Sequence, residues 1–322
     1  MSRYELPASE LTPEEIFRTR RTLLKALGFI GLNAWPLLNA CTNYAAQSRD
    51  VRGTLVNLKQ IQAVRNPAYT LDRPLTDRLE AAGYTNFYEF TQGKEVWRSV
   101  DRFLTRPWEV RITGLVKKPL TLSIDELLKL FPQEERHYRF RCVETWAMAV
   151  PWTGFPLAAL VKRAEPLSSA THLSLLSFLK RDQAPEQGRG RVELWPYHEG
   201  LTLPEAMNEL AFLATGLYGR ELPPQHGAPL RLVTPWKYGF KSIKSVVEIR
   251  FTDRQPPTFW SSLAPQEYGF WANINPGVPH PRWSQEQETL LGSGERRRTL
   301  LYNGYDGQVG HLYKQVDTRY FF

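Results

Sequence analysis

The residues best suited to chemistry lie in one short stretch, residues 139–157, with the sequence RFRCVETWAMAVPWTGFPL. It places a cysteine, Cys142, between a basic and an acidic side chain, Arg141 and Glu144. A thiolate is a nucleophile and a soft metal ligand, and a neighbouring guanidinium favours its ionised form. The pattern alone leaves three roles open for this cysteine: an inert buried side chain, a disulfide with another chain, or a metal ligand.

The N-terminal sequence bears on the role of this cysteine, because it predicts whether the chain is exported. Arg20 and Arg21 precede a moderately apolar run, residues 26–38, which is typical of a twin-arginine export signal. An ordinary N-terminal helix is the alternative, and the run is too short for a membrane span of about 20 apolar residues. We expect residues 1–46 to be the signal peptide and residues 47–322 the mature periplasmic chain.

Export would leave one thiol in the mature chain. The chain has only two cysteines, and the other one, Cys41, lies in the predicted signal. Residues 38–41 faintly resemble a lipidation site, although Asn39 fits it poorly. Cys142 would then be the sole cysteine in an oxidising compartment, so no disulfide within the mature chain is possible. Because twin-arginine export carries folded proteins, Cys142 could bind a cofactor that is inserted before export.

Composition and charge narrow the class of protein. The chain is 42% apolar and 12% aromatic, which is typical of a globular protein with a sizeable core. Its net charge is +8, and removing residues 1–46 takes away five basic and four acidic side chains and leaves +7. The basic residues are scattered, so we expect no nucleic-acid partner.

The pattern of the mature chain predicts an α+β fold with mixed sheets and short helices. Twenty-four prolines and 21 glycines interrupt the apolar segments, which makes long helices improbable on local grounds. Ser123 with Glu126 and Thr202 with Glu205 have capping-box spacing. Strands or short apolar elements are expected at residues 108–115, 138–144, 173–179, 210–217, 230–233 and 243–251, and helices at 124–131 and 156–161. The last 70 residues are too few for an added dimerisation sandwich of about 100 residues.

Three motifs together resemble a known family. Residues 141–144 (RCVE), 151–156 (PWTGFP) and 235–241 (PWKYGFK) are similar to those of the sulfite-oxidase-type molybdopterin proteins. Within that group, the chain most resembles catalytic subunits of periplasmic protein-methionine-sulfoxide reductases. The resemblance runs from residues 86–89 (NFYE) to residues 303–305 (NGY).

The resemblance implies a cofactor and its ligands. Cys142 would bind molybdenum beside the two dithiolene sulfurs of one molybdopterin, and Asn86 and Glu144 would share the catalytic site with it. Ser177 stands where the family pattern has threonine, and His226 stands where it has asparagine and adds a group that can titrate. Lys241 or Lys244 would bind the cofactor phosphate. The cofactor-binding set is Asn86, Tyr88, Glu89, Cys142, Ser177, His226, Arg231, Ser242, Ile243 and Lys244.

The chain contains no G-x-G-x-x-G or Walker-type sequence, which agrees with a molybdopterin without a nucleotide. No histidine pair has the spacing of a zinc or haem site. The resemblance implies reduction of free and protein-bound methionine sulfoxide, with oxygen transfer to molybdenum and with electrons from a quinol-linked membrane haem protein. Glu144 could deliver protons if it follows Cys142 on a regular strand. The alternatives are a sulfite oxidase or dehydrogenase, another S- or N-oxide reductase, or an exported binding protein without its metal.

Overall fold

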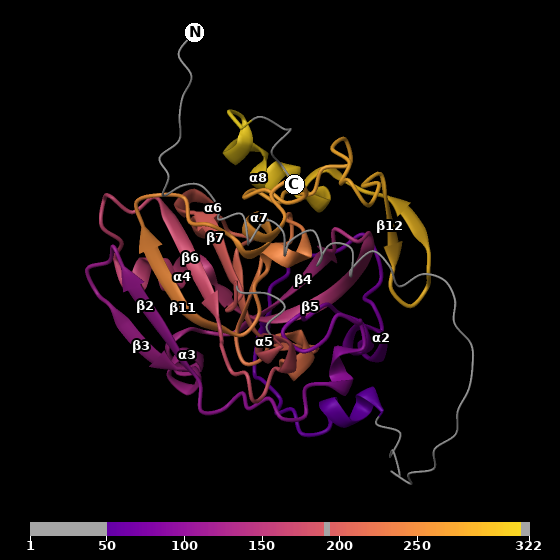
Figure 1. Cartoon of the computed structure of the whole chain (residues 1–322), viewed down its shortest axis with the longest axis horizontal. Coiled ribbons are helices and arrows are strands. Elements are labelled where there is room, and N and C mark those ends of the chain that lie inside the picture. Colours follow the sequence, from indigo (N-terminus) through magenta and orange to yellow (C-terminus); the bar gives the residue numbers. More distant parts are fainter. Residues whose placement is uncertain (1–49, 190–193, 317–322) are drawn as a thin grey trace. The chain divides into compact units, whose positions relative to one another are not determined.

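A computed structural model of the chain describes residues 50–189 and 194–316 (Figure 1). The predicted signal peptide, with Arg20, Arg21 and Cys41, lies outside these residues. The described residues belong to one compact unit. Among the residues described, no helix combines the length and the apolar character needed to cross a bilayer.

The larger sheet has eight strands and is built around β5. Strand β5 pairs along most of its length with β4 (antiparallel), and on its other edge with β8 (antiparallel) and β12 (parallel). The strands are β1 (Val64–Arg65), β4 (Glu134–Arg141), β5 (Trp146–Pro156), β8 (Phe212–Leu217), β9 (Arg220–Glu221), β10 (Arg231–Val233), β12 (Gln287–Leu290) and β13 (Arg296–Arg298).

The smaller sheet has five strands in the order β3-β2-β11-β6-β7. Only the pair β11–β2 is parallel, so both sheets are mixed, as predicted. Figure 1 shows this sheet on the left and β4 and β5 of the larger sheet to its right. Its strands are β2 (Glu109–Gly114), β3 (Leu120–Ser123), β6 (His172–Ser177), β7 (His198–Thr202) and β11 (Val246–Thr252).

The helices are short, which confirms the α+β prediction. Both predicted capping boxes are present: Ser123 with Glu126 starts α3, and Thr202 with Glu205 starts α6. The α-helices are α2 (Arg78–Gly83), α3 (Ile124–Leu130), α4 (Leu157–Ala164), α5 (Pro185–Gly188), α6 (Leu203–Met207), α7 (Phe259–Leu263) and α8 (Asp306–Val309). The 3-10 helices are η2 (Val51–Leu55), η3 (Val96–Arg98), η4 (Pro224–His226), η5 (Gly239–Lys241), η6 (Leu301–Gly304) and η7 (Gly310–Tyr313).

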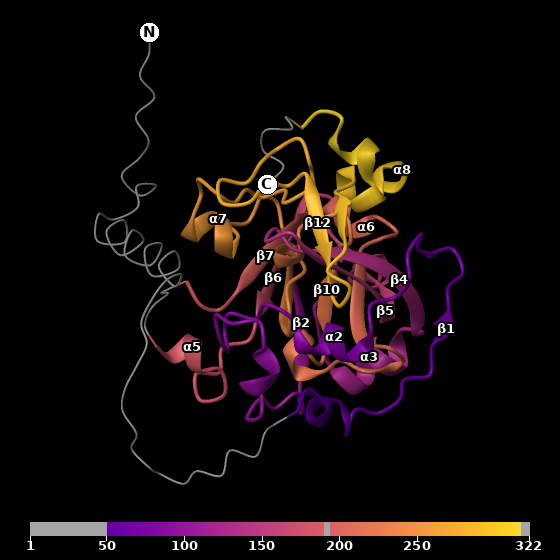
Figure 2. The same cartoon turned by 90° about the vertical axis from the view of Figure 1, so that its right-hand side faces the viewer.

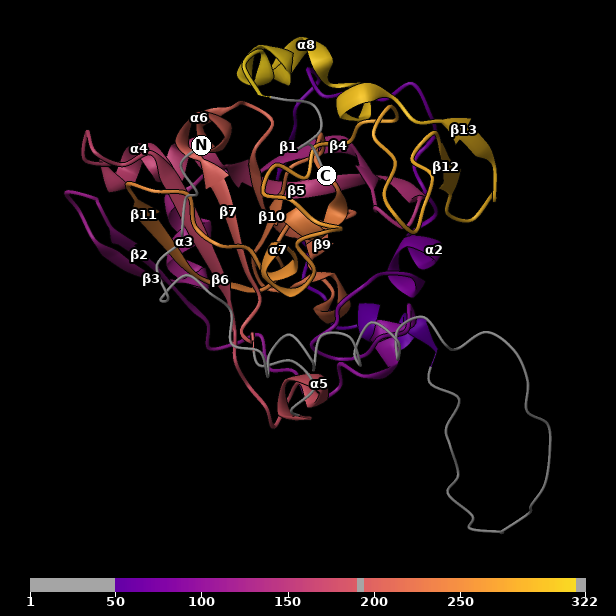
Figure 3. The same ribbon diagram turned by 45° about the horizontal axis from the view of Figure 1, so that its top comes forward.

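Strand β5 is largely apolar because it lies in the core. Every residue of β5 except Pro156 is buried, because the strand is paired on both edges and covered on both faces. Figures 2 and 3 show β12 and α8 of the C-terminal segment at the end of the unit opposite α5. That segment adds two strands and short helices without forming a separate sheet, as expected from its length.

Candidate active site

The predicted strand 138–144 ends early, and the difference creates the site. Strand β4 stops at Arg141, and residues 142–145 form the tight turn into β5. The Thr145 amide donates to the Cys142 carbonyl at 3.0 Å, and the Cys142 amide donates to the Trp146 carbonyl at 2.9 Å. Cys142 and Glu144 therefore share one pocket because of a turn, not because of a regular strand as the sequence suggested.

The turn holds a residue in an unfavourable backbone conformation. Thr145 has a φ of 75°, in the left-handed region that β-branched residues rarely adopt. Such a residue costs about 1–3 kcal/mol and persists only where the surroundings enforce it. The Thr289 amide, in β12, donates to the Thr145 carbonyl at 2.9 Å and holds the turn from outside.

A second segment, after α2, supplies the opposite wall of the pocket. Asn86 and Tyr88 face the Cys142 turn, where both donate to Glu144, while Phe87 and Phe90 are buried in an aromatic cluster with Phe178. Ring contacts and a short turn, in which the Phe90 amide donates to the Phe87 carbonyl at 3.0 Å, fix this irregular segment. The segment is therefore anchored in the core through its phenylalanines and presents the polar groups of Asn86 and Tyr88 to the pocket.

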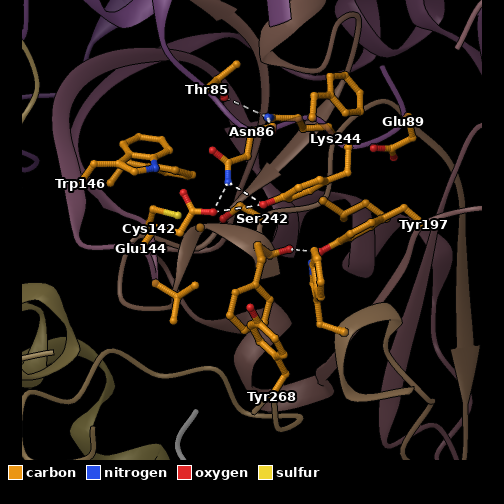
Figure 4. Close-up of a pocket in the computed structure, with 18 residues that line it drawn as sticks. Thr85, Asn86, Glu89, Cys142, Glu144, Trp146, Tyr197, Ser242, Lys244 and Tyr268 are labelled. Atoms are coloured by element: carbon orange, nitrogen blue, oxygen red, sulfur yellow. Dashed lines mark hydrogen bonds between the residues drawn. The ribbon is translucent and has the colours of Figure 1, made fainter. Parts of the chain in front are cut away.

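Glu144 is the centre of a hydrogen-bond network. Asn86 Nδ2 and the Tyr88 hydroxyl each donate to Glu144 Oε1 at 3.1 Å (Figure 4). Lys94 forms an ion pair with Glu144 Oε2 and donates to Asn86 Oδ1 at 2.8 Å. Burial, followed by the charge of Glu144, holds the pKa of Tyr88 well above its usual range. Tyr88 is therefore a hydrogen-bond donor to the carboxylate at neutral pH.

The third wall comes from residues 242–244, between η5 and β11. Lys244 crosses the pocket and donates to Thr85 Oγ1 at 3.0 Å and to the Asn86 carbonyl (Figure 4). Lys241, the other lysine considered for the phosphate, is fully buried and pairs with Glu199 at 2.9 Å. The structure thus leaves Lys244 as the lysine that faces the pocket.

The pocket gathers most of the predicted site residues. The empty space within it is about 660 Å³, including the part that opens to solvent. The predicted residues that line it are Asn86, Tyr88, Glu89, Cys142, Glu144, Ser242, Ile243 and Lys244. The sequence did not predict Thr85, Phe87, Phe140, Val143, Trp146, Tyr197, Gly239, Phe240, Trp260 or Tyr268, which also line it.

Three predicted cofactor residues lie behind the pocket wall. Ser177 donates from Oγ to the Lys244 carbonyl at 2.8 Å, so it fixes the lysine from outside the pocket. Arg231 donates to the carbonyls of His226 (3.2 Å) and Ser242 (3.0 Å). Burial, followed by the charges of Lys244 and Arg231, lowers the pKa of His226 to about 3, so this histidine stays neutral at physiological pH.

The free thiol is not ionised in this pocket. Burial, followed by the charge of Glu144, raises the pKa of Cys142 to about 12, although Lys94, the Glu144 amide and Arg141 lower it. The expected effect of Arg141 is therefore present but outweighed by desolvation. Arg141 itself contacts the Cys142 carbonyl and Thr299 Oγ1, behind the turn. A metal at the sulfur would have to displace the proton.

Electrostatics at the third wall fit an anionic cofactor. Burial, followed by the charge of Arg231, holds the pKa of Lys244 well below its ordinary value, and burial lowers that of Arg231 to about 9. The hydrogen bonds of both side chains go to neutral oxygens. Arg231 is buried and Lys244 is half-buried, and neither has a hydrogen-bonded anion. That arrangement is costly, and a phosphate beside them would offset the cost.

An unsatisfied donor and the single thiol also fit a molybdopterin. In the described part of the chain, Trp146 Nε1, which belongs to a residue that lines the pocket, has no hydrogen-bond partner. Across residues 50–189 and 194–316, no three His, Cys, Asp or Glu side chains gather as in a metal centre made of protein ligands alone. One soft thiolate suits a metal whose remaining sulfur ligands belong to a cofactor.

Similarities to known proteins agree with this site. Residues 97–260 match the family described as oxidoreductase molybdopterin binding domain. The protein-methionine-sulfoxide reductase catalytic subunit MsrP of Ralstonia nicotianae is 46% identical over 99% of this chain and 96% of its own length. The subunit of the same name from Burkholderia mallei is 42% identical, with the same coverage. The solved structure of the sulfane dehydrogenase SoxCD from Paracoccus pantotrophus is 15% identical, with a TM-score of 0.45, over 85% of this chain and 65% of that one.

The matched family covers the turn with Cys142 and the wall with Lys244, and the relatives cover almost the whole chain. The fold is therefore the sulfite-oxidase-type molybdopterin-binding fold that the motifs resembled, and the cofactor is molybdenum on molybdopterin. The chain belongs to the family of protein-methionine-sulfoxide reductase catalytic subunits.

Proposed function

We propose that this chain reduces methionine sulfoxide, free and within oxidised periplasmic proteins, to methionine. The observation that carries the proposal is the placement of Cys142 and Glu144 on one turn, facing a pocket with aromatic walls, in a chain 46% identical to a protein-methionine-sulfoxide reductase catalytic subunit. The overall reaction joins one sulfoxide, two electrons and two protons to give one thioether and one water. When bound, the molybdenum cofactor supplies the two-electron oxygen-transfer chemistry.

The walls of the pocket suit an uncharged sulfur substrate. Trp146, Trp260 and Tyr268 line the pocket, and sulfur makes favourable contacts with aromatic rings. Lys94, the cation nearest Glu144, is already paired with that carboxylate. Lys244, the other cation at the pocket, is proposed to hold the cofactor phosphate. Sulfite, an anion, would then approach the Glu144 carboxylate without a free cation, so the pocket favours a sulfoxide over sulfite.

The protein groups also suggest how protons reach the substrate. Glu144 Oε1 accepts hydrogen bonds from Tyr88 and Asn86, so this oxygen is held at a defined place on the pocket wall. A carboxyl group at such a place can accept a proton from solvent and donate it to the departing oxygen. In this proposal Glu144 holds the proton, and Asn86 and Tyr88 orient it.

The electron donor is a separate protein in this proposal. Relatives are named catalytic subunits, which implies a partner subunit. We propose that the partner is a membrane haem protein that takes electrons from quinol, and that the chain meets it in the periplasm. This is supported by the twin-arginine motif and by the absence from the sequence of nicotinamide, flavin or haem-ligand motifs.

The direct test uses purified, molybdenum-loaded protein with a reduced low-potential dye. We expect methionine sulfoxide, free and in an oxidised protein, to oxidise the dye and yield methionine. NADH and NADPH should not replace the dye, and sulfite should not reduce the enzyme at a comparable rate. Sulfite turnover without sulfoxide turnover would replace this proposal with a sulfite dehydrogenase. In cells, repair that survives deletion of every candidate membrane cytochrome would remove the haem partner.

A further inference from the structure

We propose that Lys94 is a positioning residue, which fixes the orientation of Glu144 and Asn86 in the pocket and acts on the reaction only through them. The inference rests on the proposed function, because that function gives Glu144 its task. Lys94 does not line the pocket itself. It lies five residues beyond Glu89, on the loop that leads to η3.

The contacts of Lys94 hold the carboxylate from the side opposite its other donors. Lys94 pairs with Glu144 Oε2, while Asn86 and Tyr88 donate to Glu144 Oε1. Both carboxylate oxygens therefore have a defined partner. Without the lysine, Oε2 would lose its charged donor, and the carboxylate would be held through Oε1 alone, which restricts its terminal torsion less.

Lys94 also determines which way the Asn86 amide points. A lysine ammonium can only donate hydrogen bonds, so the contact of 2.8 Å from Lys94 Nζ must be to the amide oxygen, Oδ1. The amide nitrogen, Nδ2, then faces Glu144 at 3.1 Å. If the lysine were absent, the amide oxygen would lose its charged donor, and only the contacts of Nδ2 with Glu144 and the Tyr88 hydroxyl would hold the amide. One lysine thus sets two pocket side chains.

The ion pair is better explained by orientation than by stability. The side chains of Lys94 and Glu144 are 26% and 17% exposed, so solvent screens the pair and its contribution to stability is small. The backbone of Lys94 is anchored independently, because its carbonyl accepts from the Thr85 amide at 3.0 Å. Removing the charge should therefore leave the loop in place and disturb the network around Glu144.

The test compares Lys94→Met and Lys94→Arg with a matched control, Lys118→Met. Lys118 also pairs with a glutamate, Glu165, but on the surface away from the pocket residues. Turnover per bound molybdenum should fall about 10–100-fold in Lys94→Met, the usual cost of removing a group that orients a metal site. It should stay within about threefold in Lys94→Arg and be unchanged in Lys118→Met. The electron paramagnetic resonance spectrum of the molybdenum centre should change in Lys94→Met only.

A double variant separates positioning from any other role. If Lys94 acts through Glu144, then Lys94→Met with Glu144→Gln should be no slower than Glu144→Gln alone, within about twofold. Multiplied losses in the double variant would overturn the proposal. So would a Lys94→Met protein with wild-type turnover per molybdenum and an unchanged spectrum. If Lys94→Met does not load molybdenum, Lys94→Gln carries the test, because its amide can still donate to Asn86 without a charge.

The outcome is separable from that of the proposed function. Wild-type protein that loads molybdenum but does not reduce methionine sulfoxide would refute the function. The spectra of wild type, Lys94→Met and Lys118→Met need no substrate, so they would still report on the lysine. If the wild-type enzyme is fully active and the spectrum of Lys94→Met is unchanged, the positioning role of Lys94 is refuted and the proposed function stands.

Discussion

Gly227 lies directly against Lys244: a Cβ on Gly227 would come within 2.6 Å of the Lys244 Cβ and Cγ atoms. The glycine ends η4 with a φ of +90°, in the left-handed region. Its missing side chain lets the stem of Lys244 pass, so that Nζ reaches Thr85 and the Asn86 carbonyl. The glycine thus places the cation that we assign to the cofactor phosphate.

Replacing Gly227 by alanine should therefore disturb cofactor binding as well as folding. A left-handed alanine costs about 1–2 kcal/mol, and the overlap with Lys244 adds about 1–3 kcal/mol. Gly219→Ala is the matched control, because its φ is +70° and nothing lies within 4 Å of the added methyl. The free energy of unfolding, measured with denaturant, and the molybdenum content should both be lower in Gly227→Ala than in Gly219→Ala. Equal losses in the two variants would show that the contact with Lys244 has no effect.

Cys142→Ser should abolish turnover while the protein stays folded. An alkoxide is a hard ligand in place of a soft thiolate, and the change of one buried atom is small. We expect molybdenum content to fall, with pterin retained in part through Lys244, which lines the pocket. Cys41→Ser, which changes the only other cysteine, is the control and should keep full activity. Near-normal turnover of Cys142→Ser would remove the thiolate from the mechanism.

Local sequence signals predicted the fold well where the physics is local. The capping boxes at Ser123 and Thr202 are present, and the alternation in residues 108–115 gives strand β2. The end of β4 was mispredicted, because the turn at residues 142–145 is closed by hydrogen bonds and by Thr289, which is remote in sequence. Residue propensities do not predict the positive φ of Thr145, because the tertiary structure enforces it.

The residues of the site also fall into two groups: those that a sequence motif marks and those that only tertiary contacts place. Cys142, Asn86 and Glu144 could be named because motifs mark them, and the structure brings them to one pocket. Lys94 carries no motif, and its role depends on the loop that folds it back beside Asn86. Ser177 and Arg231 were predicted as cofactor contacts, but they support the wall from behind, through carbonyls of residues 242 and 244. Backbone-mediated support of this kind leaves little trace in a single sequence.

The buried pair Lys237–Glu205 should be essential for stability. Both side chains are almost fully buried, and Glu205 also accepts from Tyr313 at 2.6 Å. Glu205→Gln would leave the Lys237 charge without its partner, at a cost of about 3–5 kcal/mol. Glu165→Gln, which breaks the exposed pair with Lys118, should change the free energy of unfolding by about 0–1 kcal/mol. Urea unfolding of the two variants provides the measurement. Similar losses of unfolding free energy in Glu205→Gln and Glu165→Gln would contradict the prediction.

Export should depend on the arginine pair. Changing both Arg20 and Arg21 to lysine is expected to leave unprocessed precursor in the cytoplasm, because the twin-arginine route requires the pair. Changing Arg3 and Arg18 to lysine in the same segment keeps the charge balance and should not affect export. Cell fractionation with antibodies provides the measurement. Full processing of the Arg20/Arg21 variant in the periplasm would refute the twin-arginine assignment.

Glu89 should make the metal-free protein less stable as the pH rises. Burial raises the pKa of this pocket carboxyl to about 7 from an ordinary value of 4.5, against the opposing effects of its own amide and Lys244. The folded state therefore holds a proton that the unfolded chain releases above pH 4.5. The stabilisation is complete below that pH and is lost as the pH rises to about 7, a change of about 3 kcal/mol.

The comparison of wild type with Glu89→Gln isolates this contribution, because other titrating groups are common to both proteins. Relative to the variant, the wild type should lose about 3 kcal/mol of unfolding free energy between pH 4 and pH 7.5. Glu109→Gln, at an exposed site on β2, is the control and should show no such trend. Metal-free protein is required, since a bound phosphate near Lys244 would alter the field at Glu89. A pH-independent difference between wild type and Glu89→Gln would mean that Glu89 is already ionised in the folded protein.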